Sequence, residues 1–353
     1  MSLPPLRYCR QMGLWSSHGQ GSLIRRPKVR FATLSGAAGL SAYCDSGMKR
    51  LRLVTLNISF TVLLSALSYS QQEMKEAEFG WARWSPDGSS VVASVWRTNQ
   101  ARHSIVVLPV QTGTARTLAE GPHPGVSPTW SPDGRQVSYV VTRADGTGSL
   151  WTVNSDGTDA HVVGDAAWID LVGGYCWTSD SKHFLFFDAR NLRRYFVMDL
   201  AGNRQDIALP NATLPMHGIE WSPDRSRIAF STSDTRRLHI AGPHAEQPRL
   251  VTRSLETTWE TWPSWSPNAD KLLYTASPIR SGKESVWSVR PDGSDNQLRI
   301  ADGARAQYSP DGRRILYLQG RKGSYYERIC LANAEGSQAT ALAGEGSSLS
   351  ACR

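Results

Sequence analysis

The sequence predicts an all-β protein built from six repeats of one four-stranded antiparallel unit, and three observations carry this prediction. A Trp-Ser-Pro-Asp-Gly motif stands intact at residues 84–88 and 130–134 and returns in altered form at positions 177, 221, 265 and 308. The anchors recur at intervals of 46, 47, 44, 44 and 43 residues, a period that indicates a propeller or a linear array. After residue 71, short β-rich runs alternate with Gly, Pro, Asn and Asp clusters, and no run of eleven residues shows helical periodicity. The predicted fold is a six-bladed β-propeller.

The first 70 residues are expected to lie outside this fold. A basic run at 48–52 precedes the mostly apolar residues 53–67, and Ser68 and Ser70 then offer small residues for cleavage near Gln71. This order is typical of a secretory signal peptide at residues 48–70, and the apolar run is short for a membrane span. Because signal peptides begin near an N-terminus, we expect translation to start at Met48 and residues 1–47 to be an over-extended, disordered upstream segment. A start at Met1 with a long basic region is the alternative.

The charge divides in the same way. The whole chain has a formal net charge of +8, but residues 71–353 hold 30 basic and 30 acidic side chains and are formally neutral. The basic character therefore belongs to the leader and does not indicate nucleic-acid binding.

Each repeat of residues 71–353 is predicted to form one blade of four strands. The anchor aromatic ends the first and innermost strand, and a polar loop separates the second strand from the third. An Asp-Gly turn leads to the fourth and outer strand. Examples of the second, third and fourth strands are residues 137–141, 150–153 and 161–163.

The anchor motif itself is predicted to be a tight turn after the first strand. Proline presets φ, Ser or Asp bonds nearby backbone, and Gly accepts a positive φ. We expect the third, fourth and fifth of these turns to be irregular, because Ser181, Arg225 and Ala269 replace the glycine. The turn carboxylates are expected to bond backbone rather than metal.

The ring is expected to close by packing alone. The first blade begins with its inner strand near residues 79–81, and the sixth ends with an outer strand near 339–342, so no strand is exchanged between the ends. A closed ring leaves no exposed sheet edge for pairing with other chains, and we expect a monomer.

The cysteines do not suggest a disulfide framework. Cys176 and Cys330 fall in opposite blades, too far apart for a bridge, whereas Cys330 with Cys352 is geometrically possible. Three cysteines after residue 71 are an odd number.

The repeat anchors are interpreted as structural residues. A large aromatic at one position of every repeat would wedge between neighbouring blades. The anchors are Trp84, Trp130, Trp177, Trp221, Trp265 and Tyr308.

These motifs resemble a known repeat. The Trp-Ser-Pro-Asp-Gly turn, the Ile-Ala-Phe-like strand after it and the later Asp-Gly hairpin resemble the propeller repeat of TolB-like proteins, over about residues 79–345. The same WD-like repeat occurs in the propeller of prolyl-oligopeptidase-type enzymes. The resemblance therefore implies the fold, and it implies a binding protein or an enzyme alike. We expect neither the α/β domain that precedes the propeller of TolB nor the hydrolase domain of the peptidases.

Enzymatic chemistry has little support in the sequence. It contains no Gly-x-Ser-x-Gly elbow, no His-Glu-x-x-His and no glycine-rich phosphate loop. His103, His123 and His217 fall in loops of one predicted face, and three histidines could hold a metal. The scaffold resembles that of propeller lyases that act on pectin fragments with a metal held in this way, and this resemblance implies the alternative function, a metal-dependent, lyase-like carbohydrate-active propeller enzyme. The paired histidines of such lyases are missing here.

The same face has a charge pattern that favours a binding function. Acids and the tryptophans Trp168, Trp259 and Trp262 occupy the inner loops. Arginine with tryptophan is typical of interface anchors, and a solvated rim without a partner is the other interpretation. The loops joining second and third strands carry twelve basic side chains: Arg97, Arg102, Arg143, Arg190, Arg193, Arg194, Arg236, Arg237, Arg280, Lys283, Arg321 and Lys322.

The sequence therefore predicts a periplasmic or secreted propeller that acts as a protein-binding scaffold. We expect a protein partner in the cell envelope, no cofactor, no catalysis of its own and no membrane span after signal removal. Arg193, Arg194, Arg236 and Arg237 are expected to steer an acidic partner.

Overall fold

A computed structural model describes residues 77–97, 102–121, 125–143, 148–165, 175–187, 194–208, 216–232, 235–242, 246–252, 258–280, 282–322 and 325–344. These residues form strands, turns and connecting segments, and no α-helix occurs among them. In the same residues, no helix is long and apolar enough to span a membrane. The predicted upstream segment and signal peptide lie outside the described part of the chain.

Four sheets contain four antiparallel strands each, paired in chain order. The β5–β8 sheet consists of Gly125–Trp130, Gln136–Thr142, Gly148–Asn154 and His161–Asp165. The β9–β12 sheet consists of Tyr175–Trp177, His183–Phe187, Arg194–Asp199 and Arg204–Ala208. The β13–β16 sheet consists of Met216–Trp221, Ile228–Thr232, Leu238–Ala241 and Arg249–Leu250. The β17–β20 sheet consists of Thr258–Trp265, Leu272–Pro278, Ser285–Val289 and Gln297–Ile300.

The remaining eight strands form one sheet. Strands β1–β4 are Ala77–Trp84, Ser90–Arg97, Arg102–Pro109 and Arg116–Gly121. Strands β21–β24 are Ala304–Tyr308, Arg314–Lys322, Tyr325–Asn333 and Thr340–Gly344. Pairing between β1 and β23 joins the two groups. An all-β propeller with four-stranded blades is thus confirmed, and an eight-stranded sheet stands where two separate blades were expected.

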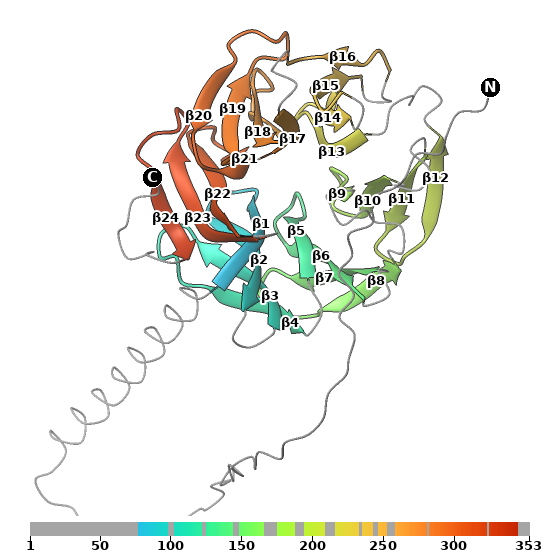
Figure 1. Cartoon of the computed structure of the whole chain (residues 1–353). Helices are drawn as coiled ribbons and strands as arrows, with labels where there is room; N and C mark the ends of the chain where they lie inside the picture. Colours follow the sequence, from blue (N-terminus) through green and yellow to red (C-terminus); the bar gives the residue numbers. More distant parts are fainter. Residues whose placement is uncertain are drawn as a thin grey trace, which may run out of the picture. The chain divides into compact units, whose positions relative to one another are not determined.

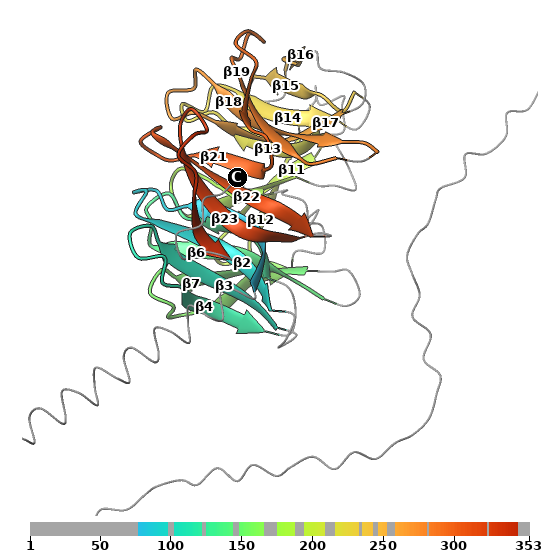
Figure 2. The ribbon, with the colours of Figure 1, turned by 60° about the vertical axis from the view of Figure 1, so that its left-hand side comes forward.

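The first strands of the sheets lie toward the middle of the ring (Figure 1). Strand β1 contacts β5 and β21, β5 contacts β9, and β17 contacts β13 and β21. The later strands of each sheet lie progressively outward. Figure 2 brings forward the side on which strands β1–β4 and β21–β24 meet, with β1 between β23 and β2 in the sheet.

The ring does not close by packing alone. Phe79 of β1 pairs with Tyr326 of β23 on one side while it stays paired with Val95 of β2 on the other, and a register shift between Phe79 and Trp81 separates this start of β1 from the rest of the strand. The Gln307 Nε2 atom donates to the Ala82 carbonyl oxygen at 2.7 Å, and the Arg305 guanidinium donates to the Gly80 carbonyl oxygen. Strand pairing and side-chain hydrogen bonds to backbone carbonyls therefore supplement packing where the two ends of the fold meet.

The apolar core is divided into clusters between neighbouring sheets. Trp84 packs with Leu316 of β22, and Trp177 packs with Leu150 of β7. Trp265 packs with residues of β14 and β15, and its indole Nε1 donates to the Glu220 carbonyl oxygen at 3.2 Å. These three anchors are buried; Trp177 and Trp265 lie between their own sheet and the preceding one, and Trp84 lies between the two strand groups of the eight-stranded sheet. Burial of such large aromatic surfaces at each junction stabilises the ring.

The two cysteines in the described residues differ. Cys330 is buried in β23 and is disulfide-bonded, with its partner outside the described residues. Cys176 of β9 carries a free thiol.

The anchor turns share one conformation, contrary to the expected irregularity. The φ angle is 70° at Gly88, and it is 56°, 60° and 58° at Ser181, Arg225 and Ala269. The amide of Arg225 donates to the Ser222 carbonyl oxygen at 2.9 Å, as the amide of Gly88 does to Ser85. The turn tolerates non-glycine residues because side-chain hydrogen bonds on both sides of this position hold it in place.

These side-chain bonds run between the second and fourth residues of the motif. The Ser85 hydroxyl donates to Asp87 at 2.6 Å and accepts from the Ser90 amide at 3.0 Å, and Ser222 and Asp224 repeat the first contact at 2.6 Å. Hydrogen bonds from serine hydroxyls lower the pKa of both aspartates. The turn carboxylates thus bond to their own turn.

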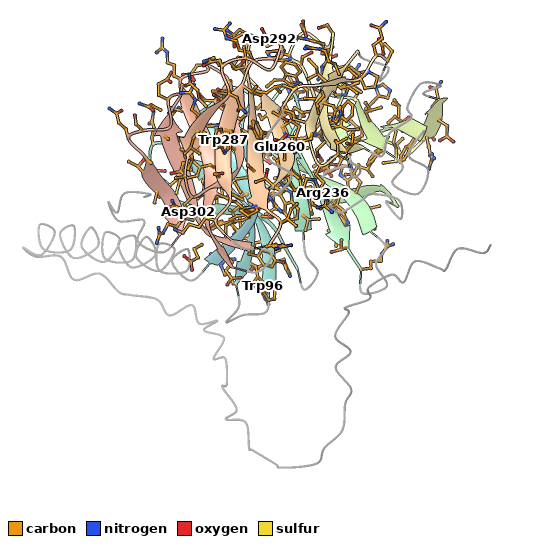
Figure 3. All side chains as sticks on the ribbon, turned by 45° about the horizontal axis from the view of Figure 1, so that its top comes forward. Trp96, Arg236, Glu260, Trp287, Asp292 and Asp302 are labelled. Carbon is orange, nitrogen blue, oxygen red and sulfur yellow. The ribbon has the colours of Figure 1, made fainter. Side chains whose placement is uncertain are left out.

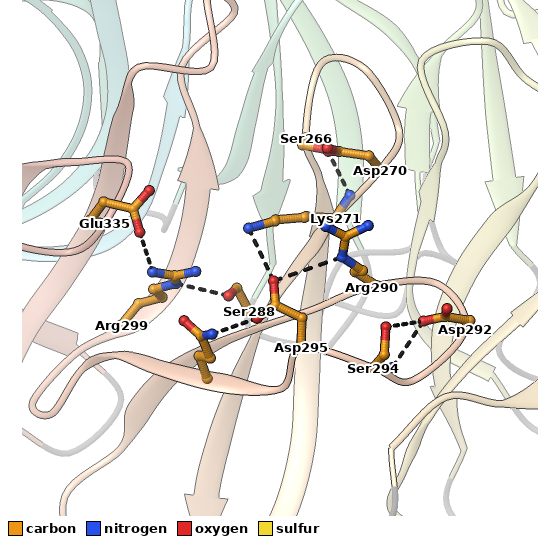
Figure 4. A network of polar contacts seen from close by, with 11 residues as sticks. Ser266, Asp270, Lys271, Ser288, Arg290, Asp292, Ser294, Asp295, Arg299 and Glu335 are labelled. Carbon is orange, nitrogen blue, oxygen red and sulfur yellow. Dashed lines mark hydrogen bonds and ion pairs between the residues drawn. The ribbon is translucent and has the colours of Figure 1, made fainter.

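The fifth anchor turn reaches the same conformation with a different carboxylate. Asn268 stands where the other turns have aspartate, and the Ser266 hydroxyl donates to Asp270 at 2.8 Å instead. Further polar contacts lie next to this turn, across the β17–β20 sheet (Figure 4). Lys271 pairs with Asp295 at 3.3 Å, and Arg299 pairs with Glu335 of the following repeat at 2.5 Å.

A bulge recurs in the first strands and was missed from the sequence. Register shifts interrupt β1, β5, β13, β17 and β21 a few residues before the anchor. In four of these strands the residue three before the anchor has a positive φ: Ser127 at 53°, Gly218 at 62°, Trp262 at 56° and Arg305 at 53°. A bulge bends the strand and re-aims the side chains next to it.

Candidate functional site

The two sides of the ring carry different connections. The anchor turns and the turns between third and fourth strands emerge on one side, here called the turn face. The connections from second to third strands, and from each sheet to the next, emerge on the other side, here called the loop face. Figure 3 shows the two faces. Trp96, near the end of β2, lies on the loop face, and Asp292, between β19 and β20, lies on the turn face.

Arg236 and Trp259 meet on the loop face across two neighbouring sheets. Arg236 lies between β14 and β15, and Trp259 lies at the start of β17. The guanidinium carbon of Arg236 is 5.9 Å from the centre of the Trp259 ring, which is cation–π distance. The Arg236 carbonyl oxygen also accepts from the Glu260 amide at 3.0 Å. Trp259 remains 38% exposed, so this pair presents an aromatic surface and a positive charge to solvent.

Arg237 and Glu260 form a buried pair beneath this surface. Their side chains are 12% and 0% exposed, and Arg237 Nη1 lies 3.8 Å from Glu260 Oε1. The other carboxylate oxygen accepts from the Leu238 amide at 2.9 Å and from the Thr252 hydroxyl. Burial raises the pKa of Glu260, while these donors and Arg237 oppose the shift. Arg237 therefore ties two sheets together and is not aimed at solvent like its neighbour Arg236.

Trp262 lies apart from Trp259 although it follows only three positions later in the chain. Trp262 is half-buried, and the guanidinium carbon of Arg305 lies 4.6 Å from its ring. The same guanidinium is 4.3 Å from the Trp81 ring and 5.5 Å from the Tyr326 ring. Arg305 thus sits among aromatics of β1, β17 and β23.

A cavity of about 630 Å³ opens on the loop face next to β18–β19 and β22–β23. Lys283 pairs with Asp302 across it at 2.6 Å. The Glu284 carboxylate accepts from the Tyr326 hydroxyl at 2.7 Å and from Ser277 at 2.9 Å. The lining of the cavity also includes Gln319, Glu327 and Arg328, so the cavity offers charged and hydrogen-bonding groups to a ligand.

One repeat position makes the equivalent contact at two junctions. Trp259 and Asp302 each stand six residues before their anchor, Trp265 and Tyr308. Each meets a basic side chain from the preceding sheet's loop, in the pairs Arg236–Trp259 and Lys283–Asp302. Aligning the repeats on their anchors would have revealed this position, whereas the cavity itself had no sequence signal.

The other predicted site residues are not brought into this group. Trp168, Arg193 and His123 lie outside the described residues. Arg194 begins β11 and His217 lies in β13, where the backbone alone is described. The His103 ring packs on Trp96 at 4.1 Å between centroids. Within the described residues, no three His, Cys, Asp or Glu side chains gather in a way that could hold a metal.

The fold and the two faces define the chain as a β-propeller of the type seen in TolB. A structure of TolB from Acinetobacter baumannii superposes with a TM-score of 0.54 and 17% sequence identity. The match covers 74% of this chain and 61% of the TolB chain. A structure of putative TolB from Agrobacterium tumefaciens superposes with a TM-score of 0.55 and 17% sequence identity. That match covers 69% of this chain and 90% of the other chain. At this identity the likeness concerns the fold, and the fold is TolB-like.

Two curated relatives match by sequence. Dipeptidyl-peptidase 5 of Porphyromonas endodontalis is 22% identical over 268 residues, which cover 73% of this chain and 31% of the peptidase. An uncharacterized protein of Agrobacterium fabrum is 28% identical over 159 residues, covering 42% of this chain and 53% of that protein. The chain thus spans about a third and about half of these relatives. No protein-family model matches it.

Proposed function

We propose that this protein is an exported, non-catalytic propeller scaffold that binds a protein partner through its loop face. The observation that carries the proposal is the exposed Trp259 beside the Arg236 guanidinium. A large rigid aromatic with an adjacent arginine is the combination that dominates binding energy in protein interfaces. The buried Arg237–Glu260 pair holds this surface in place from below.

We infer six blades for this scaffold. Strands β1–β4 and β21–β24 are each four antiparallel strands paired in chain order, with one anchor turn apiece. One residue pair, Phe79 with Tyr326, links β1 to β23. Treating the eight-stranded sheet as a first and a sixth blade agrees with six anchor motifs at nearly equal spacing.

An acidic partner would be steered by the basic loops and held by the tryptophan. Charges at the rim of an interface act mainly on the association rate, and buried aromatic anchors act on dissociation. Arg236 belongs to the first group and Trp259 to the second. The TolB-like fold supports a binding function, and the sequence likeness to a peptidase makes catalysis the competing class.

The binding experiment uses the exported chain as bait in a cell-envelope extract, followed by binding kinetics on the captured protein. We expect Trp259→Ala to weaken affinity by about 2 kcal/mol or more, and Arg236→Ala to slow association, more so at low salt. Arg290→Ala is the matched control, because Arg290 is an exposed arginine on the turn face. Equal binding by all four proteins would contradict a partner on the loop face.

Export is tested separately by N-terminal sequencing of the protein recovered outside the cytoplasm. We expect the mature chain to begin between Tyr69 and Gln72. Recovery of residues 1–47 on the exported protein would contradict both the signal peptide and the start at Met48.

A further inference from the structure

A second cavity lies on the turn face, inside the ring of first strands. Its volume is about 280 Å³, and it is lined by residues of β1, β5, β9, β13 and β21 together with parts of the anchor turns. The residue immediately before the anchor reaches it from five repeats: Arg83, Thr129, Cys176, Glu220 and Gln307. One repeat position thus converges on one cavity.

This position behaves differently from the anchor next to it. The anchor is tryptophan five times and tyrosine once, as expected where every repeat performs the same packing. The position before it holds six different side chains, the sixth being Ser264, and all of them are polar or charged apart from the thiol. A position that is polar or charged in five of six repeats, and never the same residue, does not serve repeated packing. Its side chains are individually placed around a shared space.

Arg225 adds a second, independent observation. It occupies the turn position at which Gly88, Gly134 and Gly312 stand in other repeats, and it has a φ of 60°. A side chain is strained in this left-handed conformation, and such strain gathers at functional sites. The guanidinium of Arg225 lies 6.0 Å from the Trp221 ring at the cavity wall. Ser181 and Ala269 show that the turn accepts other side chains at this φ, so what distinguishes Arg225 is that its guanidinium group lines the cavity.

The charges around the cavity do not balance. Arg83 and Arg225 are cationic, and Glu220 is the carboxylate that lines the cavity with them. Burial raises the pKa of the Cys176 thiol to about 11, so the thiol is neutral at ordinary pH. Burial also raises the pKa of Glu220, with Arg83 and Arg225 opposing the shift. Two guanidinium groups facing one carboxylate favour an added anion.

We propose that this cavity binds a small carboxylic acid that also carries a hydroxyl or ammonium group. The ligand carboxylate is placed between Arg83 and Arg225, since guanidinium groups match carboxylates with two parallel hydrogen bonds. The ligand's hydroxyl or ammonium group donates to Glu220. The cavity lies on the face opposite Trp259, so the proposal does not depend on the loop face binding a partner.

Calorimetric titration with L-malate and L-glutamate tests the proposal, with succinate and inorganic phosphate as comparison probes. We expect saturable binding of at least one of the first two. Succinate lacks the donor for Glu220 and should bind more weakly, and phosphate should bind more weakly still. Glu220→Gln should reduce the preference for malate over succinate.

Two variants locate the binding. Arg225→Gly removes a guanidinium but suits the positive φ, so the fold is kept, and we expect affinity to fall about tenfold or more. Ala269→Gly makes the same backbone change in the fifth anchor turn, outside the cavity, and should leave affinity unchanged. Bound acid should also slow maleimide labelling of Cys176, followed by mass spectrometry of the peptide that contains it.

The proposal is overturned if neither acid binds, or if phosphate and succinate bind as well as malate. Unchanged affinity in Arg225→Gly, or unchanged labelling of Cys176 with acid bound, would also overturn it. The last two results would place any bound acid elsewhere on the protein.

Discussion

At the scale of single residues, positive φ angles mark where the chain accepts strain. One set lies in the anchor turns, where Ser181, Arg225 and Ala269 copy the conformation of glycine. Another lies in the bulges of the first strands and includes Trp262 and Arg305, whose side chains pack against each other. In the first set the side chain adds nothing that the turn requires, whereas Trp262 and Arg305 of the second set pack together where β1, β17 and β23 meet.

Replacing Arg225 by glycine should therefore be neutral or stabilise the protein, by up to about 1 kcal/mol. Relief of the left-handed strain outweighs or offsets the greater freedom that glycine gives the unfolded chain. Urea denaturation measures the difference.

Arg313→Gly is the control, because Arg313 lies in the sixth anchor turn and its φ is not positive. That change should cost roughly 0.5–1 kcal/mol. A loss above about 1 kcal/mol in Arg225→Gly would show that the contacts of the guanidinium outweigh the strain.

At the scale of elements, the anchor turn owes its uniform shape to a hydroxyl–carboxylate pair. Ser85 with Asp87, Ser131 with Asp133 and Ser309 with Asp311 make the same short hydrogen bond. In the fourth turn, Ser222 and Ser226 lower the pKa of Asp224 to about 2. Hydrogen bonds to the charged carboxylate favour its ionised form.

This lowered pKa makes the turns sensitive to acid. A carboxylate with a folded pKa below its unfolded value of 3.8 stabilises the fold above that value, and the contribution is lost as pH falls toward 2. We expect the free energy of unfolding to decrease across this window. Asp224→Asn should make the decrease smaller, since an amide does not titrate.

Urea denaturation of the wild-type protein and Asp224→Asn at a series of pH values measures this difference. The fifth turn keeps the same φ with Asn268 at the equivalent position, where Asp270 accepts the serine hydrogen bond instead. Parallel pH profiles for the two proteins would contradict the assignment.

At the scale of the whole molecule, the ends of the fold are joined around Arg305. Its guanidinium contacts the rings of Trp81, Trp262 and Tyr326 and donates to the Gly80 carbonyl oxygen. These partners come from β1, β17 and β23, so one side chain links the first residues of the propeller to two later sheets. A planar cation suits this place because it stacks on aromatic faces and still donates in its own plane.

Arg305→Gln should lower the free energy of unfolding by about 2 kcal/mol, through the loss of desolvated cation–π contacts. Arg305→Lys should recover only part of that loss, because an ammonium group has no planar face. Arg313→Gln, at an exposed turn of the same sheet, should have little effect. An equal effect of the two glutamine variants in urea denaturation would contradict a special role for Arg305 in closing the ring.

The sequence by itself determined the repeating part of this protein. The anchors Trp84 and Trp130, the Ser-Pro-Asp turns and the four short strands of each repeat depend on local turn chemistry and on alternation within about 45 residues. Such features are visible in the chain because the residues that make them are close in sequence and recur. Arg236 and Trp259 were each candidates from the sequence, whereas their contact with each other was not predicted.

Only the tertiary structure decided what is made between repeats. It placed Phe79 opposite Tyr326, separated Trp262 from Trp259 by a bulge, buried Arg237 against Glu260, and brought Arg83, Cys176 and Glu220 to one cavity. Bulges have no common residue type, since Ser127, Gly218, Trp262 and Arg305 share the same conformation. The contacts around the ring join residues that are far apart in sequence. Some partners are one repeat apart, and others, such as Gln307 and Ala82, are separated by more than two hundred positions. Their partners are chosen by how twisted sheets pack around an axis, and no local pattern in the chain encodes that choice.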